Sequence, residues 1–140
     1  MTETQESKLT WKQDMAFAAE LQGHQFMVDA SSEHGGKDLG PRPKTLVLTA
    51  LAGCTGMDVV AILKKMRVTF AAFEVKVSGE LTENHPKVYD KIHVIYHLKG
   101  ENIDRTKVER AVELSRTTYC GVFAMLAHTA KVTHDIIIDT

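Results

Sequence analysis

Residues 43–66 read PKTLVLTALAGCTGMDVVAILKKM and predict the clearest helix of the sequence. Pro43 suits the first turn of a helix, where its missing N–H needs no partner. Lys64 and Lys65 stand at the other end, where positive charge complements the helix dipole. The middle is apolar on nearly every face, and such a helix is normally surrounded by protein. A helix of about 35 Å is more than a small domain can enclose alone, so we expect a second copy of the chain to complete its burial.

The flanking segments predict strands in blocks. Three short strands are expected within residues 8–30, with a turn at Gly23-His24, followed by a loop over residues 31–42. Apolar and polar residues alternate over 73–78 and again over 92–98, which predicts an antiparallel hairpin.

The remaining segments complete the element order. Asp104 can cap a helix that carries Val108, Ala111, Val112 and Ser115 on one face, and a third helix is expected from Tyr119 to Ala130. A strand over residues 132–138 ends the chain. The order β-β-β-α-β-β-α-α-β, with strands in blocks, predicts an α+β fold, which we interpret as one domain over residues 1–140.

The composition excludes several classes of function. The chain has 140 residues, 17 basic and 18 acidic, with a formal net charge of -1, so a nucleic-acid partner is not expected. The N-terminus lacks a basic region followed by an apolar one, and two cysteines without a signal sequence point to a reducing compartment, the cytoplasm. The apolar run from Leu46 to Leu63 contains Asp58 and two glycines, which favours a buried core helix over a membrane span.

Cys54 lies between Gly53 and Thr55-Gly56 in the predicted central helix. Glycine costs about 1 kcal/mol relative to alanine inside a helix, so these glycines need another reason, such as close approach of a backbone or a substrate to the sulfur. The alternative is a packed cysteine that behaves as a small hydrophobic residue. Because Cys54 lies well beyond the first helical turn, activation of its thiol would need a nearby cation, for which the candidates are Arg42, Lys44 and Arg116.

Cys120 falls within the first turn of the predicted third helix. Unpaired N–H groups there favour an anion, which predicts a lowered thiol pKa. Two thiols are what two-step peroxide reduction requires, since one forms a sulfenic acid and the other condenses with it to a disulfide. The alternative is two unrelated cysteines.

The sequence predicts neither a metal site nor a cofactor. It contains seven histidines but no HExxH motif and no CxxC pair. His93 and His97 share a strand face, but four residues along a strand span about 13 Å, too far for one ion. Asp58, one turn after Cys54, either orients a hydroxyl within a polar network or is a solvated carboxylate.

Two motifs of this sequence match those of a known family. The first is Gly40-Pro41-Arg42-Pro43 together with residues 46–60 around Cys54, and the second is Tyr119-Cys120-Gly121-Val122. They resemble the motifs of the OsmC/Ohr family (osmotically inducible protein C and organic hydroperoxide resistance protein), and within it the YhfA-like branch. The resemblance covers nearly the whole chain.

The resemblance implies a fold of antiparallel sheets around a long central helix, in an intertwined homodimer with active sites at the subunit interface. It implies that Cys54 is the peroxidatic thiol, that Cys120 is the resolving thiol, that the substrates are organic hydroperoxides and that a lipoyl dithiol is the electron donor. The family's glutamate ten residues before the reactive cysteine is Lys44 here, and no arginine precedes Arg42. We therefore expect Arg42 or Lys44 to stabilise the thiolate.

Two other functions compete with the peroxidase. One is a redox-silent family member that binds a small hydrophobic ligand at the dimer interface, which the missing arginine and glutamate favour. The other is a dithiol oxidoreductase for protein disulfides, against which the absence of CxxC counts.

Overall fold

The computed structural model describes residues 2–140, and its contacts divide the chain into two compact units. The first unit ends at Val47 and the second runs from Leu48 to Thr140. Each is described by itself below, and the expectation of a single domain stays a prediction.

The N-terminal unit holds an antiparallel sheet in the order β1-β2-β3, formed by β1 (Lys8–Gln13), β2 (Ala16–Leu21) and β3 (His24–Val28). The three strands predicted within residues 8–30 are therefore confirmed. Gln22 and Gly23, both with positive φ, make the turn between β2 and β3, one residue earlier than predicted. Positive φ at both positions is typical of a type I′ turn, whose backbone twist matches that of the two strands it joins.

Asp29 organises the loop that follows β3, which includes the short 3₁₀ helix η1 (Ser32–His34). The buried Asp29 carboxylate accepts hydrogen bonds from the backbone N–H groups of Ala30 at 2.7 Å and of Lys37 and Leu39 at 3.1 Å each. Burial raises the pKa of Asp29, but these N–H donors outweigh it and hold the pKa below its usual value. One carboxylate thus fixes a loop without regular backbone pairing.

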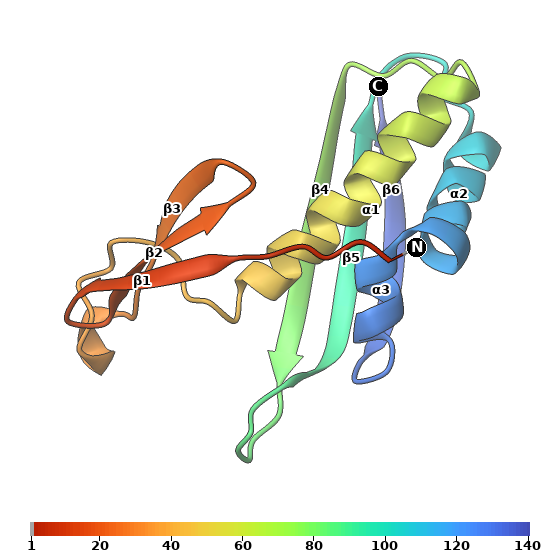
Figure 1. Cartoon of the computed structure of the whole chain (residues 1–140). Helices are drawn as coiled ribbons and strands as arrows, with labels where there is room; N and C mark the ends of the chain where they lie inside the picture. The colour runs from red at the N-terminus through yellow and green to blue at the C-terminus, as the bar shows by residue number, and fades with distance from the viewer. Residues whose placement is uncertain (1) are drawn as a thin grey trace. The chain divides into compact units, whose positions relative to one another are not determined.

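Seven further elements complete the chain in the predicted α+β order (Figure 1). They are α1 (Leu46–Lys65), β4 (Ala72–Leu81), β5 (Tyr89–Lys99), α2 (Arg105–Leu114), the π-helical turn η2 (Ser115–Tyr119), α3 (Gly121–Leu126) and β6 (Lys131–Asp139).

The helix bounds differ slightly from the prediction. The central helix begins at Leu46 rather than Pro43, because residues 43–45 form a turn in which the Leu46 N–H bonds the Pro43 carbonyl. The third helix is shorter than the predicted Tyr119 to Ala130. It begins later because η2 continues directly from α2 as far as Tyr119, and it ends earlier because residues 127–129 form a turn.

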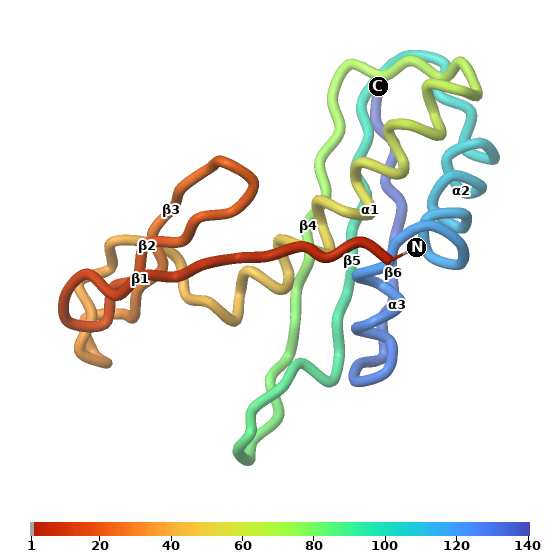
Figure 2. Tube along the Cα trace, in the orientation of Figure 1, coloured from red at the N-terminus to blue at the C-terminus, as the bar shows by residue number. Residues whose placement is uncertain are grey.

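The second sheet has the order β4-β5-β6. β4 and β5 pair antiparallel, as the alternation predicts, but β5 and β6 pair parallel from Lys91↔Lys131 to Lys99↔Asp139. This pairing differs from the expected antiparallel sheet. The cause is the crossover: Figure 2 shows the trace leaving β5, descending through α2 and α3, and entering β6 at the far end, so both strands run the same way.

The core of the second unit lies between one face of this sheet and the helices. Along β5, Ile92, Val94, Tyr96 and Leu98 are buried, while the residues between them are only partly covered, which confirms the predicted alternation. The helices contribute the buried residues Leu51, Val59 and Leu63 from α1 and Val108, Ala111 and Val112 from α2. Asp104 caps α2 by accepting from the Thr106 N–H at 2.9 Å, as predicted.

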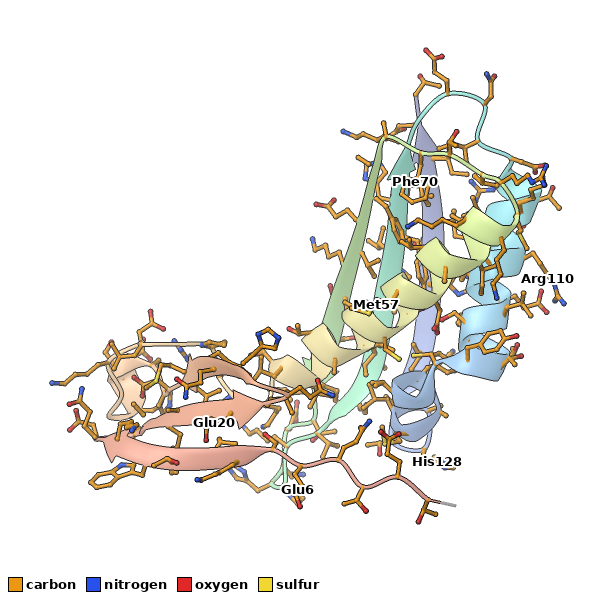
Figure 3. The ribbon with its side chains drawn as sticks, turned by 45° about the horizontal axis from the view of Figure 1, so that its top comes forward. Glu6, Glu20, Met57, Phe70, Arg110 and His128 are labelled. Atoms are coloured by element: carbon orange, nitrogen blue, oxygen red, sulfur yellow. The ribbon has the colours of Figure 1, made fainter. Side chains whose placement is uncertain are left out.

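The central helix α1 is long and apolar enough to cross a membrane by length and composition. Its buried residues instead pack into the core of the second unit, so α1 is the core helix that the sequence predicts. Gly56 lies against β4, where a Cβ would meet the Val75 side chain at 3.4 Å, an ordinary packing distance. The helix also carries Met57, labelled in Figure 3, which is 76% exposed.

Candidate functional site

The two cysteines, distant in the chain, meet in the second unit. Cys54 lies in the middle of α1 and is half-buried, whereas Cys120 is buried at the junction of η2 and α3. Their sulfur atoms and a carboxylate oxygen of Asp58 all lie within 4.8 Å of one another. Asp58 belongs to this cluster because residues four apart on a helix share a face.

Cys120 is the N-cap of α3, and its sulfur accepts a hydrogen bond from the Phe123 N–H at 3.3 Å. The lowered pKa predicted from this position is wrong, because burial raises the pKa of the Cys120 thiol to about 11. The Phe123 N–H opposes this rise, but the neighbouring Cys54 and Asp58 add to it. A six-residue helix offers too little favourable field to offset burial beside other acidic groups.

A chain of buried hydroxyls leads to Asp58. The Tyr96 hydroxyl lies 2.7 Å from Thr55 Oγ1, Thr55 Oγ1 lies 2.8 Å from Ser115 Oγ, and Ser115 Oγ lies 2.9 Å from Asp58 Oδ2. The three hydroxyl-bearing residues are at most 1% exposed. The chain joins β5, α1 and η2, so each element of this part of the core supplies one member.

The direction of donation along these hydroxyls follows from the number of hydrogens available. A carboxylate only accepts, so the single hydroxyl hydrogen of Ser115 goes to Asp58. Ser115 must then accept from Thr55, and Thr55 must accept from Tyr96. Burial raises the pKa of Tyr96, which keeps its phenol protonated and able to donate. Of the two interpretations of Asp58, the one that places it in a polar network is confirmed.

Arg116 is a cation of the same unit that the sequence proposed as a candidate. Its guanidinium donates to the Val132 carbonyl at 3.3 Å and lies 5.0 Å from the centre of the Phe123 ring. Within residues 2–140, its Nε is a buried donor without a hydrogen-bond partner. His134 lies near this charge: burial, and then the charge of Arg116, lower the pKa of His134.

Arg42 and Lys44 belong to the N-terminal unit. The Arg42 guanidinium donates to the Asp38 carboxylate at 2.7 Å and to the Gly40 carbonyl at 2.9 Å. Its charge also contributes to lowering the pKa of Asp29. Lys44 is exposed. Their expected role beside the Cys54 thiolate stays a prediction.

Sequence reasoning named both cysteines and Asp58 but assigned no role to Thr55, Ser115 or Tyr96. A signal for Ser115 was available, since it shares the predicted inward face of the second helix with three apolar residues. A hydroxyl on such a face needs a buried partner, but the pattern does not tell which residue supplies it.

The cluster of two sulfurs and one carboxylate also bears on metal binding. Zinc accepts such donors but takes four ligands in structural sites. Within the described residues, the cluster of Cys54, Asp58 and Cys120 supplies three. The absence of a metal site stays a prediction.

Comparison with known proteins gives consistent matches. A family model described as OsmC-like protein matches residues 35–135. The chain is 34% identical to protein YhfA of Escherichia coli strain K12 over 130 residues, which cover 92% of this chain and 94% of YhfA.

Two solved structures extend the comparison to the fold. A hypothetical protein from Aquifex aeolicus VF5 aligns with a TM-score of 0.83 and 27% identity, covering 99% of this chain and 100% of that one. An organic hydroperoxide resistance protein from Elizabethkingia anophelis aligns with a TM-score of 0.73 and 12% identity, covering 98% and 97% of the two chains. At 12% identity the second match concerns the fold alone.

Proposed function

The chain belongs to the family of OsmC-like proteins, and we propose that it is a thiol-dependent peroxidase that reduces organic hydroperoxides through a Cys54–Cys120 dithiol/disulfide cycle. The observation that carries the proposal is the approach of the two sulfurs to within 4.8 Å. A disulfide forms between sulfurs only about 2 Å apart, so a small movement of either side chain closes the pair. The chain also shares its fold with an organic hydroperoxide resistance protein.

The different environments of the two sulfurs support different roles. Cys54 is half-buried and therefore accessible to a substrate, whereas Cys120 is 4% exposed. The Cys54 sulfur attacks the peroxide and becomes a sulfenic acid, while the alcohol leaves. Cys120 then attacks the Cys54 sulfur, water leaves, and a disulfide remains. An external dithiol, such as a lipoyl protein, would return both thiols to the reduced state.

The test is intact-mass analysis after one equivalent of cumene hydroperoxide. The wild type should lose two hydrogens, Cys54→Ser should remain unchanged, and Cys120→Ser should gain one oxygen as a sulfenic acid. A wild type whose mass does not change would refute the peroxidase.

The second candidate is a redox-silent protein that binds a small hydrophobic ligand. An observation in the N-terminal unit favours it: Leu9, Met15, Phe17 and Val28 line an apolar pocket of about 590 Å³, with Arg42 beside them. This volume lies within the range of about 300–1,000 Å³ typical of ligand pockets. Binding of a long-chain fatty acid, together with unchanged mass after peroxide treatment, would favour this candidate.

We also propose that the protein is a homodimer in the cytoplasm. Support comes from an open apolar groove of about 460 Å³ between α1 and β4, which Met57, Val60 and Phe73 line. Light scattering of the purified protein measures the mass directly, and a mass of one chain at micromolar concentration would contradict the proposal.

A further inference from the structure

The position of Asp58 relative to the two sulfurs has a chemical use. One of its carboxylate oxygens lies within 4.8 Å of both sulfur atoms. A general base acts within direct hydrogen-bond reach or through one water, and such contacts tighten when substrate binds. Asp58 is thus close enough to serve either thiol from one location.

We propose that Asp58 is the proton carrier of this dithiol, accepting a proton from each thiol in turn and returning it to the oxygen that leaves. The inference rests on the proposed function for its first half-reaction, and its second half-reaction can be tested without peroxide.

In the first half-reaction, the proton of Cys54 moves to the Asp58 carboxylate. The thiolate sulfur attacks the terminal oxygen of the hydroperoxide, an S–O bond forms and the O–O bond breaks. The electron pair leaves on the alkoxide, which takes the proton from Asp58 and departs as the alcohol. The sulfur is oxidised to the sulfenic acid, the hydroperoxide is reduced, and Asp58 is again a carboxylate.

In the second half-reaction, Cys120 gives its proton to Asp58 and its sulfur attacks the Cys54 sulfur. The S–S bond forms, the S–O bond breaks, and the hydroxide leaves as water with the proton from Asp58. A base is needed because a thiol with a pKa of about 11 is only about one part in 10⁴ thiolate at pH 7.

The hydroxyl chain from Tyr96 to Asp58 is suited to hold the carboxylate for this task. Ser115 donates one hydrogen to Oδ2, and a carboxylate has further lone pairs for other donors. Because Thr55, Ser115 and Tyr96 are buried, the side chain of Asp58 is anchored by hydroxyls that bulk water does not contact. In this inference the three are positioning residues.

The deciding variant is Asp58→Asn, which keeps the size of the side chain and an acceptor for Ser115 but cannot carry the proton. The rate of disulfide formation with cumene hydroperoxide should fall by about 100-fold or more. The rate is measured by rapid quenching and intact mass in buffer containing EDTA. Asp90→Asn, an exposed carboxylate on β5, is the matched control and should keep the wild-type rate.

This variant separates proton transfer from a purely electrostatic role, because the two predict opposite signs. The negative charge of Asp58 helps to raise the pKa of Cys120, so removing it increases the thiolate fraction. The titratable groups close to Asp58 are Tyr96 and the two cysteines, and all three remain in the variant. If Asp58 only repelled thiolates, Asp58→Asn would react faster. An equal or faster rate in a folded variant overturns the inference.

A second measurement keeps the inference separate from the peroxidase. The aromatic disulfide 5,5′-dithiobis(2-nitrobenzoate) labels Cys54 and releases one thionitrobenzoate, and attack by Cys120 then releases a second. The second release needs the Cys120 proton removed but no peroxide. A slower second release in Asp58→Asn supports the proton carrier even where peroxide leaves the wild type unchanged, and an unaltered release overturns it.

Discussion

Both faces of the β4-β5-β6 sheet carry polar contacts, and Tyr96 and His97, which are adjacent on β5, take part in one on each face. The contacts of the inner face are buried, and those of the outer face are partly exposed. On the inner face, Tyr96 begins the hydroxyl chain, whose three hydroxyl-bearing residues are at most 1% exposed. On the outer face, His97 Nε2 contacts Asp139 Oδ2 at 2.6 Å and His93 contacts Asp135 at 3.0 Å, through side chains that are 27–69% exposed.

The difference shows that the length of a polar contact does not determine its energy. A buried hydroxyl that loses its partner finds no water and keeps the full cost of desolvation, whereas water replaces the partner of an exposed group. Substitutions in the inner chain should therefore lower the free energy of unfolding more than substitutions in the outer contacts. Four substitution experiments test that contrast, in order of decreasing effect.

The largest effect on stability is expected for Thr55→Val, which keeps the shape of the side chain and removes the middle of the inner chain. The buried Tyr96 hydroxyl loses its acceptor, so the free energy of unfolding should fall by about 1–3 kcal/mol. Urea denaturation measures it. Thr133→Val on the outer face, where Thr133 Oγ1 contacts His93 Nδ1 at 2.6 Å, is the control and should change it by less than about 1 kcal/mol.

Next comes the coupling between Thr55 and Ser115, since the two hydroxyls share one hydrogen bond. A double-mutant cycle with Thr55→Val and Ser115→Ala should give an interaction energy of about 1 kcal/mol. Strict additivity would mean that the two hydroxyls contribute to stability independently of each other.

A smaller, pH-dependent effect is expected from His134, which faces inward and lies edge-on to Tyr96. Its folded pKa is lowered by burial and by Arg116, so the unfolded chain binds its proton more readily. The stabilising contribution of neutral His134 is therefore present above about pH 6.5 and is lost as the pH falls through the folded pKa.

Thermal unfolding across this range checks the sign for His134. The wild type should lose stability from pH 7 to pH 5, and His134→Gln should lose less over the same interval. A variant that declines as steeply as the wild type would show that His134 titrates alike in both states.

The smallest effect is expected for Asp139→Asn, which weakens the contact with His97 on the outer face. The free energy of unfolding at pH 7 should change by less than about 1 kcal/mol. Urea denaturation again measures it, and a loss as large as that of Thr55→Val would break the contrast between the faces.

Much of this architecture could be predicted because apolar periodicity is local. The alternation along β5 and the apolar stretch around Cys54 each predict an element and its buried face. The parallel pairing of β6 could not be predicted, since it depends on where the crossover returns the chain rather than on the strand itself. The raised pKa of Cys120 was also out of reach, because burial and the approach of Cys54 arise only in the folded structure.

Because the two sulfurs come from distant parts of the chain, the proposed reaction cycle would also change the stability of the fold. Cys54 and Cys120 are 66 positions apart, and a bond between them would close almost half of the chain into a ring. Restricting the unfolded chain in this way is worth about 4 kcal/mol in the chain-entropy model. Disulfide formation would thus stabilise the fold, and reduction would remove that stabilisation. The melting temperature would therefore be higher for the oxidised protein than for the reduced one.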